Sequence, residues 1–141
     1  SRFVHLEFFR LLRDHEGIGK AGDIAALEVN MRPCGGFTPD MLNFANSTDV
    51  YKRWADMIVY DRNFKKPEEV QEHYYCPFAG RRDNRNYIHS HEDILKKYKN
   101  SLCMEERMPE VLAPAMGNQT YIAKFPTKEA MMEFYDYVFA Q

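Results

Sequence analysis

Apolar and polar residues alternate along residues 27–32 (LEVNMR), which is the pattern of a β-strand with one apolar and one polar face. Glu28, Asn30 and Arg32 share the polar face, because successive side chains of a strand point to opposite sides. This strand therefore places a carboxylate, an amide and a guanidinium in one row. We expect that row to carry the chemistry of the protein.

A second strand is predicted upstream, within the apolar residues 2–12. Residues 13–23 are polar and contain three glycines, which predicts a long turn, and residues 24–32 predict the returning strand. The two strands then form a β-hairpin. Glu7 is the one acid in the first apolar run, and pairing of the strands brings it close to Glu28.

The opposite face of this hairpin is predicted to be apolar. Val4, Leu6 and Phe8 alternate on the first strand, and Val29 and Met31 alternate on the second. Apolar residues at every second position are typical of a strand with one face against a core. We expect Val29 and Met31 to face the core.

Two carboxylates at facing positions repel one another unless a cation lies between them or one of them is protonated. Mg²⁺ takes one or two protein carboxylates and completes its shell with waters and phosphates, so Glu7 and Glu28 suit it. Asn30 adds a neutral oxygen, and Arg32 can hold a phosphoryl group or an acyl phosphate through paired hydrogen bonds. The alternative is a solvated strand face, with Glu7 paired to Arg10.

The arrangement resembles the C-terminal lobe of the ATP-grasp superfamily, which includes biotin carboxylase and the large chain of carbamoyl-phosphate synthetase. The resemblance covers roughly residues 2–60. It rests on an acid within an apolar strand at residues 4–9 (VHLEFF), a turn, and residues 27–33 (LEVNMRP) followed by the glycine pair at residues 35–36.

The resemblance implies an ATP-dependent carboxylate-amine ligase, or a related ligase. It implies that Glu7, Glu28 and Asn30 are ligands of Mg²⁺ (or Mn²⁺) bridging the phosphates of ATP, so that Glu28, Asn30 and Arg32 bind the Mg-ATP. It implies that Arg32 is the catalytic residue, in contact with the γ-phosphoryl group or the acyl-phosphate intermediate. The substrate carboxylate attacks the γ-phosphorus, and a nucleophile then displaces phosphate.

The expected fold class is α+β. The resemblance places the C-terminal half of an ATP-grasp domain, built of antiparallel strands with helices, at residues 1–60. A linker at residues 61–72 and a small αβ lobe at residues 73–141 are expected to follow. We find no glycine-rich phosphate loop and no lysine-bearing strand before this region. We therefore expect a piece of a longer enzyme, inactive alone, whose ATP and small carboxylate substrate are bound with the help of lobes from the rest of the protein.

The first two helices are predicted from their caps. Thr38 followed by Pro39 starts a helix over residues 38–45, and the polar residues 46–49 (NSTD) interrupt it and cap a second helix. A stripe on the second helix is predicted to be core, and it comprises Val50, Tyr51, Trp54, Ala55 and Ile58.

The C-terminal lobe is predicted to contain three strands, at residues 73–80, 103–108 and 119–125. Ser90 and Asp93 form a capping box that opens a helix with Ile94, Leu95 and Tyr98 facing inward. Thr127 caps a final helix, whose inward face comprises Ala130, Met131, Phe134, Tyr137 and Val138.

Three weaker candidates lie outside this row. His89 and His91 have the i, i+2 spacing of metal ligands on a strand, but a solvated position at a helix start is favoured. Arg81, Arg82 and Arg85 could bind phosphate, although a solvated turn is favoured. A nucleophilic role for Cys34 is also conceivable, but there is no histidine close to it in sequence.

Composition bounds the class of protein. The chain has 141 residues, of which 45% are hydrophobic and 28% charged, enough for a core in one domain with a small lobe. A formal net charge of −2 argues against nucleic acid and anionic membranes as partners. The three cysteines, which form no close pair, fit a reducing, cytoplasmic setting. The rival function is a noncatalytic interaction module, possible as a homodimer, because its aromatic-rich hairpin would expose apolar surface.

Overall fold

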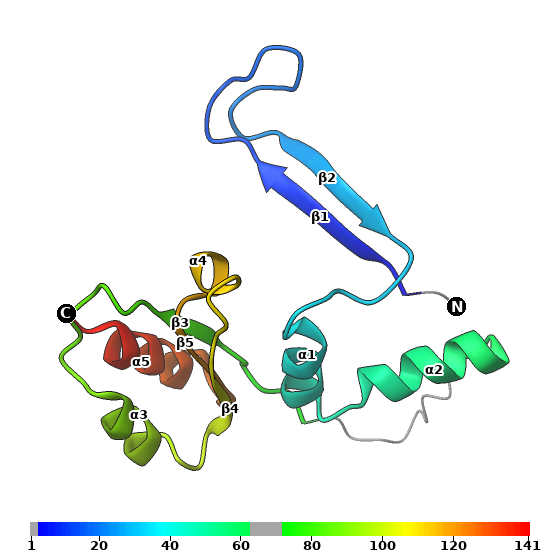
Figure 1. Cartoon of the computed structure of the whole chain (residues 1–141). Coiled ribbons are helices and arrows are strands. Elements are labelled where there is room, and N and C mark those ends of the chain that lie inside the picture. The colour runs from blue at the N-terminus through cyan, green and yellow to red at the C-terminus, as the bar shows by residue number, and fades with distance from the viewer. Residues whose placement is uncertain (1–2, 63–71) are drawn as a thin grey trace. The chain divides into compact units, whose positions relative to one another are not determined.

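A computed structural model describes residues 3–62 and 72–141. Within these residues the protein is mixed α+β, with two small antiparallel sheets and five helices, so the predicted α+β class is confirmed. The elements in chain order are β1 (His5–Arg10), β2 (Ile24–Asn30), α1 (Thr38–Asn46), α2 (Val50–Tyr60), β3 (Phe78–Arg81), α3 (His91–Lys97), β4 (Leu102–Arg107), α4 (Ala113–Met116), β5 (Gln119–Ala123) and α5 (Lys128–Phe139) (Figure 1).

The chain divides into two compact units. Of the described residues, the first unit contains residues 3–39 and 49–62, which hold the β1–β2 hairpin and α2. The second contains residues 40–48 and 72–141, which hold most of α1 and all the later elements.

This division differs from the predicted one in the placement of a single helix. Residues 40–48 group with the C-terminal unit, whereas the sequence analysis assigned all of residues 1–60 to one domain. The boundaries at residues 61–72 and 73–141 stay a prediction, and residues 63–71 of the expected linker lie outside the described residues.

The predicted hairpin is present in the first unit. Its long turn is held by two aspartates: Asp14 accepts a hydrogen bond from the Ala21 amide, and Asp23 accepts one from the Lys20 amide, both at 2.8 Å. Gly22 has a φ of 95°, a conformation that residues with a Cβ rarely adopt. The turn therefore fixes the register of the two strands through local hydrogen bonds and one glycine.

The expectation that Val29 and Met31 face a core is wrong, and the rest of the apolar face of this hairpin is exposed as well. Val4, Leu6, Phe8, Val29 and Met31 keep between 49% and 65% of their surface exposed. A two-stranded hairpin is a single layer, and it can bury a face only when a second layer of structure packs against it.

The prediction of which α2 side chains are buried is also wrong for all but one residue. The helix starts as predicted, because Asp49 accepts a hydrogen bond from the Lys52 amide at 2.9 Å. Its buried residues are Val50 and Met57, which lie two turns apart on one face. The other members of the stripe, Tyr51, Trp54, Ala55 and Ile58, are exposed.

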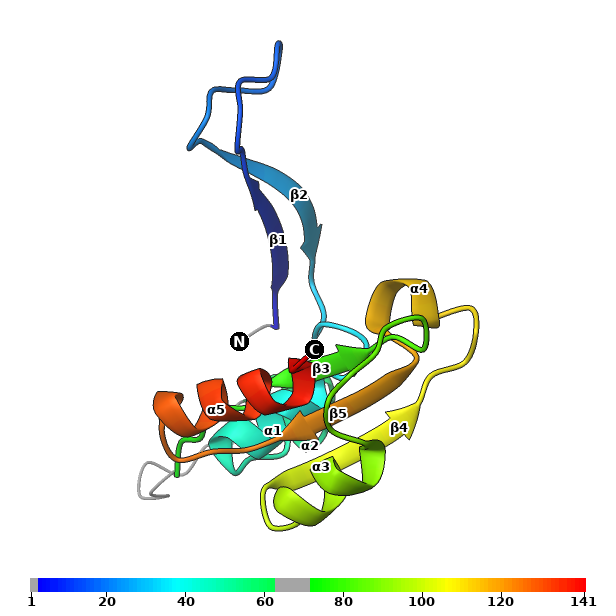
Figure 2. The same ribbon diagram turned by 90° about the vertical axis from the view of Figure 1, so that its left-hand side faces the viewer.

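The second unit is built on a three-stranded antiparallel sheet of order β3-β5-β4. Helices α3 and α5 lie on the same face of this sheet, as both views show (Figures 1 and 2). The core between helices and sheet comprises Ala79, Ile94, Tyr98, Tyr121, Ala123, Phe125, Phe134 and Val138. The predicted inward positions Ile94, Tyr98, Phe134 and Val138 are thus confirmed as buried.

Both predicted caps of this unit are also confirmed. The Ser90 hydroxyl accepts a hydrogen bond from the Asp93 amide at 3.1 Å, and the Asp93 carboxylate accepts one from the Ser90 amide at 2.9 Å. Thr127 accepts a hydrogen bond from the Ala130 amide at 3.2 Å. Each cap satisfies amides at the start of a helix that have no partner within the helix.

No helix within residues 3–62 and 72–141 is long and apolar enough to cross a membrane.

Candidate functional site

The two glutamates singled out from the sequence are cross-strand partners. β1 and β2 run antiparallel (Figure 1). Glu7 lies directly opposite Glu28, and His5 lies directly opposite Asn30. Facing positions of an antiparallel pair place their Cβ atoms about 5 Å apart on the same side of the ladder. The hairpin therefore gathers four polar side chains on one face, two from each strand.

A bulge marks the end of this polar group. The register shifts between Glu7 and Phe8, after which Phe8 pairs with Ala26, so that Leu27 is the extra residue of β2. A bulge bends the ladder and increases its twist. The polar group thus lies at the end of the hairpin remote from its turn.

Each glutamate is contacted through the same oxygen. The Glu7 Oε1 atom lies 3.1 Å from His5 Nε2. The Glu28 Oε1 atom accepts a hydrogen bond from Asn30 Nδ2 and lies 3.8 Å from an Arg32 guanidinium nitrogen. Glu7 pairs with the histidine on its own strand, not with Arg10 as the alternative interpretation of the sequence supposed.

The site is accessible from solvent. The side chains of Glu7, Glu28 and Arg32 are 42%, 43% and 50% exposed, whereas that of His5 is only 21% exposed. Arg32 also donates a hydrogen bond to the carbonyl of Pro33 at 2.9 Å, which holds its guanidinium close to the end of the strand.

The residue types fit a hard divalent cation. Over the described residues, every contact made to the two carboxylates goes to Oε1, which leaves Oε2 of each for a ligand. Asn30 uses its amide nitrogen toward Glu28, so its carbonyl oxygen faces no competing bond there. No three His, Cys, Asp or Glu side chains in this part of the chain gather as a metal cluster. Two carboxylates and an amide instead suit Mg²⁺, which keeps several waters or phosphate oxygens.

Arg81, another candidate of the sequence, is used by the fold. Arg81 is 7% exposed and donates a hydrogen bond from Nε to the carbonyl of Val138 at 2.8 Å, with its guanidinium over the Tyr87 ring. The interpretation of Arg81 as part of a solvated turn is therefore wrong, because its flat cation fills a gap between the end of α5 and an aromatic ring. Arg85 is exposed.

The histidine pair also has protein partners. His89 stacks on the Tyr137 ring at 3.5 Å between centroids. His91 Nδ1 lies 2.8 Å from the Tyr121 hydroxyl, and His91 Nε2 lies 3.9 Å from a carboxylate oxygen of Glu105. Burial raises the pKa of the Tyr121 hydroxyl that His91 contacts. The two histidines thus face different partners and do not converge.

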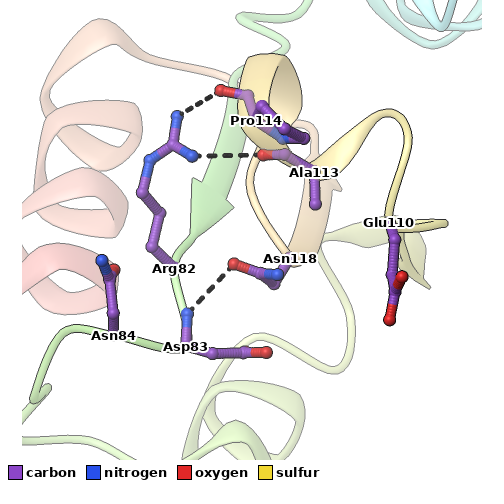
Figure 3. A pocket seen from close by; sticks show the side chains of 7 residues that line it. All are labelled: Arg82, Asp83, Asn84, Glu110, Ala113, Pro114 and Asn118. Carbon is purple, nitrogen blue, oxygen red and sulfur yellow. Dashed lines mark hydrogen bonds between the residues drawn. The ribbon is translucent and has the colours of Figure 1, made fainter.

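A shallow depression of about 360 Å³ lies beside α4 (Figure 3). Arg82 lines it and donates to the carbonyls of Ala113 and Pro114 at 3.1 and 2.9 Å. Asp83 also lines it, and Arg107 forms a bidentate pair with this carboxylate that holds its pKa below the ordinary value. The two charged groups are thus committed to stabilising the loop around the depression.

One residue of the polar face was missed from the sequence. His5 was given no role in the sequence analysis. The signal that could have found it is its i, i+2 spacing from Glu7 on a strand, which points both side chains the same way.

The comparisons with known proteins add no family. No family model matches the chain, and neither a curated protein nor a solved structure is significantly similar to it.

Proposed function

We propose that the chain supplies the magnesium- and phosphate-binding half of an ATP-dependent carboxylate-amine ligase of the ATP-grasp type. The single observation that carries this proposal is the direct pairing of Glu7 with Glu28 across the hairpin. Two acids held face to face on an exposed strand pair are unfavourable without a cation. Each of the two carboxylates has its Oε2 atom available beside Asn30. This arrangement favours an ion that also binds phosphate oxygens.

Under this proposal Glu7, Glu28 and Asn30 hold the ion through carboxylate and amide oxygens. A magnesium ion bound there would neutralise phosphate charge and orient the nucleotide for in-line attack. The protein itself contributes two strands whose ladder hydrogen bonds fix the spacing of these oxygens before the nucleotide arrives. Such preorganisation lowers the cost of assembling the site.

Arg32 is the catalytic residue in this proposal. Its guanidinium is half exposed and lies at the end of β2, next to the Glu28 carboxylate at 3.8 Å. A guanidinium matches phosphoryl oxygens through two parallel hydrogen bonds and keeps its charge at every physiological pH. It would therefore stabilise the negative charge that gathers on the transferred phosphoryl group and on the acyl phosphate.

The nucleotide base and the carboxylate substrate are assigned to lobes outside this hairpin. The α+β architecture of the chain is compatible with the C-terminal half of an ATP-grasp domain followed by a small lobe. We therefore expect the isolated chain to bind Mn²⁺ or Mg²⁺ weakly and to hydrolyse no ATP.

The proposal is tested by titrating the 141-residue chain with Mn²⁺ and following its amide NMR signals. Paramagnetic broadening is expected to centre on β1 and β2 and to disappear in Glu28→Gln. The control is Glu16→Gln, which removes an exposed acid from the turn of the same hairpin and should leave the broadening unchanged. Broadening that is absent from the hairpin, or equal in Glu28→Gln, would overturn the proposal.

A second test uses an intact ligase that contains this chain. Glu28→Gln should abolish substrate-dependent formation of ADP. Arg32→Lys should lower the turnover by about a hundredfold, because lysine keeps the charge but loses the paired hydrogen bonds that the guanidinium makes to the transition state. Unchanged ADP formation in Glu28→Gln would contradict the assignment.

The exposed apolar face of the hairpin favours a second candidate function. Leu6 and Val29 are cross-strand partners on the face opposite the glutamates, and they are 50% and 64% exposed. Apolar surface of this kind, gathered on one side of a hairpin, is typical of interaction sites. The rival proposal is a noncatalytic module that forms a homodimer through this face. It predicts concentration-dependent association with no response to divalent ions.

A further inference from the structure

The contacts within the hairpin have an internal symmetry. On β1 the residue two positions before the glutamate contacts Glu7 Oε1, and on β2 the residue two positions after the glutamate contacts Glu28 Oε1. These two residues, His5 and Asn30, are themselves cross-strand partners. Each carboxylate thus has one nitrogen donor from its own strand, and the two donors are cross-strand neighbours.

The chemistry of the His5 ring fixes which nitrogen carries the proton. Nε2 lies 3.1 Å from a carboxylate oxygen, which can only accept a hydrogen bond, so Nε2 must be the protonated nitrogen. Nδ1 is buried and has no hydrogen-bond partner among the described residues. A proton on Nδ1 would leave a buried donor unsatisfied and would set a bare Nε2 against the carboxylate, and both effects are unfavourable. The Nε2–H tautomer is therefore selected.

We propose that His5 is a positioning residue of the cation site, which holds the Glu7 carboxylate by donating its Nε2–H to Oε1 so that Oε2 remains for the ion. This inference rests on the proposed function of the same hairpin. The His5 side chain is 21% exposed and that of Glu7 is 42% exposed, so His5 is the more fixed member of the pair. Hydrogen bonds from residues that do not themselves bind a metal orient its ligands, and their loss typically lowers affinity 10- to 100-fold.

Two variants of His5 separate the donor from the ring. His5→Gln keeps an N–H donor near the position of Nε2, whereas His5→Phe keeps a flat ring and removes the donor. In the Mn²⁺ titration of the whole chain, His5→Phe is expected to weaken binding about 10-fold. His5→Gln is expected to bind within about threefold of the unmodified chain, because the hydrogen bond is restored.

A spectroscopic measurement tests the same hydrogen bond without metal. Among the neutral rings, long-range ¹⁵N NMR of His5 in the metal-free chain should show the tautomer with the proton on Nε2. In Glu7→Gln this preference should weaken, because a neutral amide oxygen is a poorer acceptor than a carboxylate. A ring protonated on Nδ1 in the unmodified chain would overturn the inference.

The outcomes distinguish this inference from the proposed function. If Glu28→Gln loses Mn²⁺ but His5→Phe keeps full affinity, His5 has no positioning role and the magnesium site stands. If His5→Gln is as weak as His5→Phe while cross-strand amide signals show an intact hairpin, the donor account is overturned. If the unmodified chain binds no Mn²⁺ at the hairpin, both proposals fail.

Discussion

Glu7 and Glu28 occupy directly opposed positions of the β1–β2 ladder, and each is contacted at Oε1 by a donor from its own strand. The hairpin therefore holds two carboxylates close together although they repel one another. We predict from this arrangement that the stability of the hairpin depends on whether a cation is present.

The first prediction concerns that dependence. In metal-free buffer, Glu7→Gln should stabilise the hairpin by about 0.5 kcal/mol, because one of two like charges is removed at constant shape. Amide hydrogen exchange of β1 and β2 measures the change. Adding Mg²⁺ should slow exchange in the unmodified chain and have little effect in the variant, since an ion stabilises only the state that binds it. The control Glu16→Gln should respond to Mg²⁺ as the unmodified chain does.

The second prediction concerns the apolar face. We expect the isolated chain to self-associate through Leu6 and Val29, because association removes these exposed apolar side chains from water. Leu6→Ser combined with Val29→Ser should shift the molar mass measured by light scattering toward the monomer. Val111→Ser, at a position 84% exposed in the other unit, should not. A monomeric unmodified chain at high concentration would refute this expectation.

The third prediction concerns the contact of β3 with the end of α4. A Cβ on Gly80 would lie 1.9 Å from the carbonyl oxygen of Met116, and backbone cannot move away as a side chain can. Gly80→Ala should therefore lower the free energy of unfolding by about 3 kcal/mol or more, as overpacking does. Gly35 has nothing within 4 Å of its would-be Cβ, so Gly35→Ala should change stability by less than about 0.5 kcal/mol. Thermal unfolding followed by circular dichroism compares the two.

The fourth prediction concerns Cys76. Burial raises its pKa from 9.0 to about 11. At pH 8 the folded protein should therefore react with iodoacetamide at Cys76 at least about tenfold more slowly than the urea-unfolded chain, because only the thiolate reacts. Peptide mapping by mass spectrometry gives the rate at this residue. Equal rates in the folded and unfolded chain would show that the thiol is not shielded.

The same shift has a consequence for stability. A thiol whose pKa is raised on folding stabilises the folded state fully below pH 9.0, and this contribution is lost as the pH rises toward 11. Cys76→Ala should remove that part of the alkaline destabilisation, which urea unfolding at pH 8 and pH 10.5 would detect.

The local elements of this protein follow from its sequence because their causes are local. The hairpin was predicted from a period of two and a glycine-bearing turn, and the helix starts at Asp49, Ser90 and Thr127 were predicted from side chains that cap the next turn. Four-residue α4 was missed, since so short a helix has no periodic pattern to detect.

The sequence by itself predicted that Glu7 and Glu28 lie close together on paired strands, because alternation and pairing act between neighbouring residues. Their exact facing depends on the bulge at Leu27, since the register of Phe8 with Ala26 would otherwise place Glu7 opposite Leu27. Burial was decided only by the tertiary structure. Val29 and Met31 have the pattern of core residues yet are exposed, whereas Arg81 has the pattern of a turn residue yet is buried. The reason is physical: whether a face is buried depends on the layer that packs against it, and a strand's own residues do not specify that layer.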